Sequence, residues 1–238
     1  PEVFSQLQNG LSVQANHQLA QNTSIEALVN QITSQIKLLP LVKHSVLRGR
    51  NFRILALDGG GLRGTFTAAV LTKWDDMIKQ GGGNNLISHF DLVAGTSTGA
   101  ILAIGLALGI QPREILSFYR QKGPQIFPKD RKLRHWLNSK HESSSLKAML
   151  LEVYGDKVLA ENSLCRLVIP TVRANHGHAE AIVTPHSLDR TAFRDIKAVE
   201  AALASSAAPT YFDESVWDTP IATESFLDGG VWANNPIL

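Results

Sequence analysis

The stretch LALDGGGLRGTF, residues 55–66, holds four glycines within six consecutive positions. An apolar run typical of a buried strand, residues 52–58, leads into the glycines, and a helical pattern follows them at residues 65–79. A glycine-rich loop between a strand and a helix exposes backbone N–H groups that attract negative charge. The stretch therefore predicts a site for a phosphate group or for an oxyanion that exists only during a reaction.

Strand-like and helix-like patterns alternate along most of the remaining chain. A second strand pattern at 89–95 runs into a sharp turn, and an apolar helix pattern follows at 99–110. Later strands are expected at 166–174, 180–186 and 224–230, and later helices at 112–123, 144–155 and 196–207. This alternation predicts an α/β protein with a mostly parallel central sheet covered by helices on both faces.

Residues 1–49 are predicted to form an N-terminal extension that precedes the main domain at 50–238. A Thr-x-x-Glu capping box at Thr23 begins a helix in this extension, and Pro40 ends it. Apolar residues at helical spacing give this helix one apolar face: Ile25, Leu28, Val29, Ile32 and Ile36. We expect the helix to pack on the main domain, and a lid or a partner-binding helix is the alternative.

The composition is that of an ordinary globular protein. The chain has 238 residues, of which 44% are hydrophobic and 18% are charged. The net charge of +2 is too small to predict a nucleic-acid-binding protein. No apolar run reaches the length of about 18 residues that a transmembrane helix requires, so no transmembrane segment is predicted.

Two further features bear on where the protein works. The single cysteine, Cys165, excludes an intrachain disulfide and fits a reducing compartment, so we expect a cytoplasmic protein in which Cys165 is a core residue. The densest basic stretch, PKDRKLRHW at 128–136, is expected to form a solvated loop. The alternative is contact with anionic lipid head groups, with Trp136 as an interfacial anchor, which would give peripheral association with a membrane.

The segment GTSTG at 95–99 fits the pattern G-x-S-x-G between a strand and a helix. This setting is typical of a nucleophile elbow, in which a strained turn presents the serine hydroxyl clear of the backbone. Side chains two residues before and after the serine would collide, which explains the two flanking glycines. Ser97 would lie at a helix N-terminus, where the helix dipole favours negative charge. The simpler alternative is a tight turn with a serine N-cap.

A serine nucleophile needs a base, and the histidines of this chain supply none in the expected order. No histidine follows Asp228, and His186 could act only in a chain order different from that of α/β-hydrolases. Asp228, which ends a strand pattern before two glycines, is the predicted base, with a simple Asp-Gly turn as the alternative. A carboxylate is a weak base unless desolvated, so a Ser–Asp pair favours esters over amides. His176 and His178 lack a third ligand, so no metal site is predicted.

The glycine loop also fits the dinucleotide fingerprint G-x-G-x-x-G at 59–64. That fingerprint requires an acidic residue about 20 positions further on, where this chain reads KQGGGNN. An oxyanion hole requires only N–H groups that face the developing charge, and Arg63 would add positive charge nearby. A nucleotide-binding protein and a catalytically silent interaction domain remain the alternatives to an enzyme.

Taken together, the motifs resemble those of the patatin-like phospholipase family, from about residue 50 to the end. The loop DGGGLRG at 58–64, the elbow at 95–99 and the triplet DGG at 228–230 occur in the family's order. The segments ASSAAPTYF at 204–212 and ANNP at 233–236 are also similar to family segments. The joint occurrence of these motifs is far more specific than any one of them alone.

The resemblance implies a three-layer α/β/α sandwich. It also implies hydrolysis of acyl esters in phospholipids or other glycerolipids at a membrane surface, without a metal or cofactor. It assigns a catalytic dyad to Ser97 and Asp228, and an oxyanion loop to Gly59, Gly60 and Gly61 with Arg63 beside them. The segment IFP at 126–128 resembles bacterial members, some of which are activated by a nucleotide. Family members usually continue with further helices, so we expect the catalytic domain at 50–238 to be cut short at its C-terminus.

Overall fold

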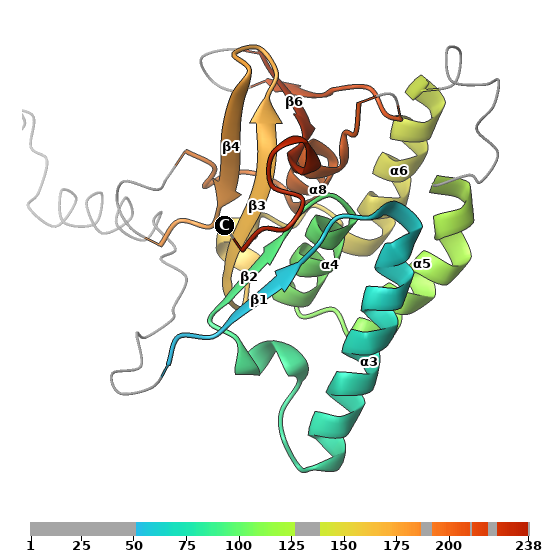
Figure 1. Cartoon of the computed structure of the whole chain (residues 1–238), viewed down its shortest axis with the longest axis vertical. Coiled ribbons are helices and arrows are strands. Elements are labelled where there is room, and N and C mark those ends of the chain that lie inside the picture. The colour runs from blue at the N-terminus through green and yellow to red at the C-terminus, as the bar shows by residue number, and fades with distance from the viewer. Residues whose placement is uncertain (1–50, 127–138, 187–191, 210, 219–222, 238) are drawn as a thin grey trace, which may run out of the picture. The chain divides into compact units, whose positions relative to one another are not determined.

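The computed structural model describes residues 51–126, 139–186, 192–209, 211–218 and 223–237 (Figure 1). The helix predicted to begin near Thr23 and the basic stretch at 128–136 lie outside these residues. Within the described residues, parallel strands of one sheet are flanked by helices. The α/β class predicted from the sequence is therefore confirmed.

Six strands form one mixed sheet in the described part of the chain. They are β1 Ile54–Leu57, β2 Leu92–Gly95, β3 Arg166–Arg173, β4 His178–Val183, β5 Ser215–Asp218 and β6 Thr223–Asp228. The strand order is β1-β2-β3-β6-β5, and β4 pairs with β3 outside this path. The strands β1, β2 and β3 are mutually parallel, whereas β4 and β6 are antiparallel to β3 and β5 is antiparallel to β6.

Short connections explain two of the antiparallel pairs, β3 with β4 and β5 with β6. Only residues 174–177 separate β3 from β4, and only residues 219–222 separate β5 from β6. Parallel neighbours need a crossover of about a dozen residues or more, so such short links join antiparallel strands. The sheet is consequently mixed, with its parallel part confined to β1, β2 and β3.

One edge of β3 brings two strand ends together. The strand β2 pairs with the first part of β3, with Ala94 opposite Val168, and β6 pairs with the last part, with Asp228 opposite Thr171. The strand β4 occupies the other edge of β3. Because β2 and β6 run toward each other along the shared edge, their carboxyl ends meet near Pro170. Pro170 lies between these two pairings, where neither β2 nor β6 pairs with it, while Ala181 of β4 is its partner on the other edge of β3.

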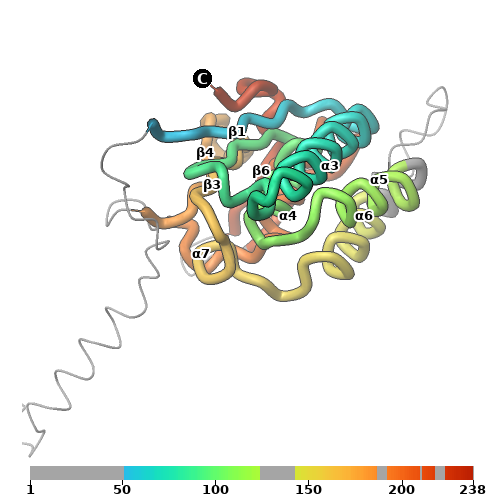
Figure 2. Tube along the Cα trace, turned by 90° about the horizontal axis from the view of Figure 1, so that it is seen from below, coloured from blue at the N-terminus to red at the C-terminus, as the bar shows by residue number. Residues whose placement is uncertain are grey.

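Helices and 3₁₀ turns connect these strands. They are α3 Gly64–Gln80, α4 Thr98–Ala107, α5 Pro112–Ile126, α6 Ser139–Tyr154, α7 Leu159–Asn162, α8 Ala198–Ser206, and the turns η1 Gly61–Arg63, η2 Leu86–His89 and η3 Gly229–Val231. The helices α4 and α8 contact each other and the strands, and α3, α5 and α6 pack beside them (Figure 2). Since β1, β2 and β3 follow one another in one direction, right-handed crossovers bring their helices to one face.

The helix α4 forms the centre of the core. All its residues are buried, as expected for a helix that is apolar on every side. The Tyr119 hydroxyl on α5 donates to the Thr98 carbonyl at 2.9 Å, and the Tyr154 hydroxyl on α6 donates to the Ile101 carbonyl at 2.6 Å. These bonds fix the first turn of α4. Cys165 is buried in the same core, which confirms its prediction as a core residue.

Candidate active site

Ser97 lies on the turn between β2 and α4. Its φ of 55° and ψ of −124° make it the one non-glycine residue with positive φ among the described residues. A residue with a Cβ atom adopts this conformation only under strain, and nucleophile elbows have such strain. Because α4 begins at Thr98, the Ser97 hydroxyl lies at the electropositive end of a buried helix.

The two flanking glycines allow this turn to close. A Cβ atom at Gly95 would overlap the carbonyl of Gly99. A Cβ atom at Gly99 would in turn overlap the carbonyls of Leu57 and Asp58 at the end of β1. The struck atoms belong to the backbone, apart from the Ala103 Cβ atom near Gly95, which has no rotamer to change, so no side-chain movement could relieve the overlap. The prediction that the flanks must be glycine is therefore confirmed.

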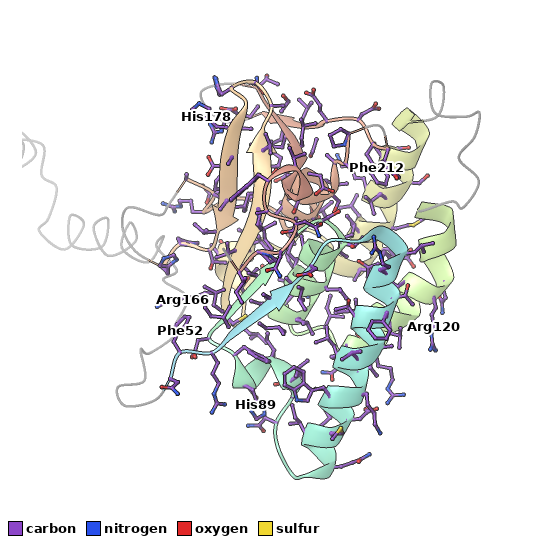
Figure 3. The ribbon with its side chains drawn as sticks, viewed as in Figure 1. Phe52, His89, Arg120, Arg166, His178 and Phe212 are labelled. Carbon is purple, nitrogen blue, oxygen red and sulfur yellow. The ribbon has the colours of Figure 1, made fainter. Side chains whose placement is uncertain are left out.

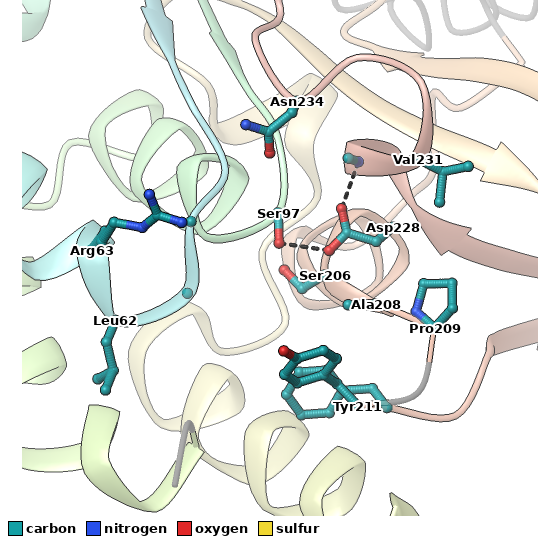
Figure 4. A pocket seen from close by; sticks show the side chains of 14 residues that line it. Leu62, Arg63, Ser97, Ser206, Ala208, Pro209, Tyr211, Asp228, Val231 and Asn234 are labelled. Carbon is teal, nitrogen blue, oxygen red and sulfur yellow. Dashed lines mark hydrogen bonds between the residues drawn. The ribbon is translucent and has the colours of Figure 1, made fainter. Parts of the chain in front are cut away.

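Asp228 lies opposite Ser97 at the end of β6. The Ser97 hydroxyl donates to Asp228 Oδ2 at 2.6 Å, and the Gly230 N–H donates to Asp228 Oδ1 at 2.6 Å (Figure 4). Asp228 is only 4% exposed. Burial raises the pKa of its carboxyl above the ordinary value of 3.8, and the hydrogen bonds from Ser97 and Gly230 oppose this shift. The Asp228 carboxylate is therefore a stronger base than a solvated aspartate.

Backbone contacts hold Asp228 in this position. Gly229 packs directly on the Pro170 carbonyl, where a side chain would not fit. The Asp228 N–H donates to the Ala207 carbonyl at 2.9 Å, which ties the end of β6 to the end of α8. The first glycine after Asp228 is thus a packing requirement and not only a turn residue.

Two of the three amides predicted for the oxyanion loop are already bonded. The Gly59 N–H donates to the Asn234 carbonyl at 3.1 Å, and the Gly60 N–H donates to Thr98 Oγ1 at 3.1 Å. Gly59 also does not line the cleft. In this structure these two N–H groups hold the loop against its neighbours, and the oxyanion role expected of Gly59 and Gly60 stays a prediction.

The next two amides of the loop are open to the cleft. The N–H groups of Gly61 and Leu62 have no acceptor among the described residues, and both residues line the cleft. Arg63 also lines the cleft, and its guanidinium makes no ion pair with another described residue. Available donors and a positive charge therefore border the cleft from η1.

A cleft of about 710 Å³ opens above the Ser97–Asp228 pair (Figure 4). This volume lies within the usual range for small-molecule sites. Its polar lining includes Ser97, Ser206, Asp228 and Asn234, and its apolar walls are Leu62, Ala208, Pro209, Tyr211, Phe212 and Val231. The cleft can therefore bury a hydrocarbon chain beside a reactive hydroxyl.

Sequence reasoning did not assign roles to two residues that shape the site. Ser205 Oγ accepts a hydrogen bond from the Ser97 N–H at 3.0 Å and donates one to the Pro170 carbonyl at 2.6 Å. The backbone of Asn234 bonds Gly59, and its side chain lines the cleft. Both residues lie in segments that resemble the family, but the amino-acid sequence alone does not show which atoms form hydrogen bonds.

The histidines considered from the sequence, His176, His178 and His186, do not line this cleft. The His186 Nδ1 atom is 3.0 Å from the Thr184 carbonyl, and His186 does not line the cleft. The rings of His176 and His178 are 6.4 Å apart at the turn between β3 and β4. The described residues contain no group of three side chains that could hold a metal ion. Among the helices in the described ranges, none is both long enough and apolar enough to cross a bilayer.

An α/β fold that presents a serine on a strained elbow against a carboxylate has the geometry of a serine hydrolase site. The family model described as patatin-like phospholipase matches residues 55–238. The chain therefore belongs to the patatin-like phospholipase family, and its fold is the patatin fold.

Curated relatives agree with this assignment. The chain is 36% identical over 192 residues to a protein of Pseudomonas aeruginosa named cGAMP-activated phospholipase, covering 79% of this chain and 55% of the relative. A protein of the same name from Vibrio cholerae is 36% identical over 198 residues, covering 77% and 55%. Patatin-like protein 2 of Arabidopsis thaliana is 28% identical over 212 residues, covering 80% and 52%. The chain thus spans about half the length of these relatives.

Proposed function

We propose that the protein is a lipid acyl hydrolase of the phospholipase A type, with Ser97 as nucleophile and Asp228 as base. The observation that carries this proposal is the 2.6 Å hydrogen bond from the Ser97 hydroxyl to the buried Asp228 carboxylate. The strained turn and the apolar walls of the cleft support it. Membership of a phospholipase family favours a lipid substrate, which we expect the protein to take from a membrane surface.

The first half of the reaction forms an acyl-enzyme. Asp228 accepts the hydroxyl proton while Ser97 Oγ forms a bond to the carbonyl carbon of the ester. The resulting oxyanion accepts hydrogen bonds from the N–H groups of Gly61 and Leu62, and Arg63 adds positive charge. The bond to the leaving alcohol then breaks, and the alcohol takes the proton from Asp228. Water hydrolyses acyl-Ser97 in the second half, with Asp228 again as base.

The proposal is tested by labelling and by substitution. A fluorophosphonate should label the peptide containing Ser97, and S97A should abolish the label and the release of fatty acid from phospholipid vesicles. D228N should remove most of both, because the serine loses its base. S88A, which changes an exposed serine in η2, is the matched control and should keep both activities. Equal labelling of S97A and the unchanged protein would refute the assignment.

The relatives named cGAMP-activated phospholipases suggest one condition for this assay. Each measurement is made with and without cGAMP, so that a requirement for an activator is not mistaken for a lack of activity. The alternative that the loop at 59–64 binds a dinucleotide is separated by melting the protein with NAD or ATP. A ligand of the folded protein raises the melting temperature. The bonded amides of Gly59 and Gly60 argue against that alternative.

A further inference from the structure

A second serine of the cleft carries a hydroxyl without a partner. Ser206, the last residue of α8, is 2% exposed, and its Oγ atom is buried without a hydrogen-bond partner among the described residues. Ser206 lines the cleft, and Figure 4 shows its hydroxyl directed toward the Ser97–Asp228 pair. The site thus contains a buried hydrogen-bonding group that the proposed reaction has not used.

The neighbouring serine shows that this feature is specific to Ser206. The Ser205 hydroxyl already accepts one hydrogen bond and donates another, so it has a structural role. The other buried side-chain polar atoms without a partner in the described residues belong to His89, Ser163, Arg166 and Glu224. None of these residues lines the cleft, and Figure 3 places His89 and Arg166 far from Phe212, which does.

A buried hydroxyl without a partner is costly, so such groups are usually paired with protein or with water. Ser206 lines the cleft and its hydroxyl is directed toward the Ser97–Asp228 pair (Figure 4), so a partner for this hydroxyl can come from the contents of the cleft. The backbone also holds Ser206 beside the proposed base, Asp228, because the carbonyl of the adjacent Ala207 accepts a hydrogen bond from the Asp228 N–H. Ser206 and Asp228, which both line the cleft, are therefore held on backbone segments that are hydrogen-bonded to each other.

We propose that Ser206 positions the water that hydrolyses acyl-Ser97, an inference that rests on the proposed function. The water donates one hydrogen to the Asp228 carboxylate and the other to Ser206 Oγ, which leaves a lone pair free to attack the acyl carbon. As the water oxygen bonds to that carbon, its first proton passes to Asp228. The bond from carbon to Ser97 Oγ then breaks, Asp228 returns the proton to Ser97, and the fatty acid leaves.

Competition between water and methanol tests this arrangement. Methanol has only one hydroxyl hydrogen, which goes to Asp228, so its attack on acyl-Ser97 does not need Ser206. In a p-nitrophenyl ester assay containing methanol, S206A should raise the ratio of methyl ester to fatty acid by about tenfold, the effect of one net hydrogen bond. This ratio is set after the acyl-enzyme forms, so it does not depend on which step limits turnover.

Two further variants control the measurement. S206C replaces the oxygen with a larger sulfur atom that is a weak acceptor, and it should shift the ratio in the same direction. S163A removes a buried hydroxyl without a partner that lies away from the cleft, and it should leave the ratio unchanged. A ratio in S206A equal to that of the unchanged protein, or lower, overturns the proposal. Absence of any acyl-Ser97 in the unchanged protein instead refutes the proposed function, and the water-positioning role with it.

Discussion

The strain at Ser97 predicts that two inactive variants of this residue differ in stability. Both S97A and S97G remove the hydroxyl, so neither can form an acyl-enzyme and both leave Asp228 without its serine partner. They differ only in whether a Cβ atom remains at a φ of 55° and a ψ of −124°. These angles are those of the first central residue of a type II′ turn, which glycine dominates.

The size of the difference follows from two opposing contributions. Holding a residue with a side chain in a sparsely populated region costs about 1–3 kcal/mol, and glycine relieves that cost. Glycine also makes the unfolded chain more flexible, which costs about 0.4–1 kcal/mol. We therefore expect S97G to be more stable than S97A by about 1 kcal/mol. For a domain of this size that difference raises the melting temperature by about 2–4 °C.

Urea and thermal unfolding of the two purified variants measure this difference directly. The matched control is the same pair of substitutions at Ser145, an exposed residue inside α6. There the order should reverse, with the glycine variant less stable by about 1 kcal/mol, because glycine is a poor residue for a helix interior. If S97A is as stable as S97G while the control behaves as expected, the turn stores no strain.

Three further predictions concern the base and the packing of the elbow. Because burial raises the pKa of Asp228, its ionised form weakens the fold at neutral pH, so D228N should be inactive yet more stable than the unchanged protein. That advantage should shrink as the pH falls through the raised pKa toward 3.8, which paired unfolding curves at several pH values would show. In the unchanged protein, kcat/KM should fall in acid with a midpoint above 3.8, and a midpoint at or below 3.8 would contradict the buried base. G99A should destabilise the fold by about 3 kcal/mol or more by overlapping the backbone of β1, whereas G81A, which meets only ordinary contacts, should change it by about 1 kcal/mol or less.

The elbow and the glycine loop could be predicted from the sequence because each depends on residues that are close together in the chain. The elbow at 95–99 needs glycine, serine and glycine in fixed positions, and the apolar runs on both sides define its strand and helix. The same holds for β1 and α3 around the glycine loop. The pairing of Ser97 with Asp228 was predicted because no histidine stood in the expected order, and the family resemblance assigned the same two residues. The geometry now supplies the reason. The ends of β2 and β6 meet on one edge of β3.

The parts that sequence reasoning missed depend on distant contacts. The antiparallel direction of β4, β5 and β6 is set by connection length and pairing. The strand β5 was not predicted, because its residues SVWD do not form an apolar run like those of β1 and β2. Its Trp217 stacks on Phe226 of β6, a contact that no local signal reveals. Which loop amides stay open is likewise decided by Asn234 and Thr98, which lie far from the loop in the sequence.

A serine activated directly by an aspartate sets a chemical limit on the substrate. No histidine is among the described residues that line the cleft, so in the proposed reaction one carboxyl takes the serine proton and then gives it to the leaving group. Burial raises the pKa of Asp228, which makes its carboxylate a better acceptor for the serine proton. The hydrogen bonds from Ser97 and Gly230 oppose this shift and favour the ionised form. A carboxylic acid can protonate an alkoxide readily, but an amine leaving group demands protonation before the carbon–nitrogen bond breaks. In the proposed reaction, one buried acid beside an elbow serine is therefore suited to esters, and we expect the apolar walls of the cleft to favour those with a hydrocarbon chain.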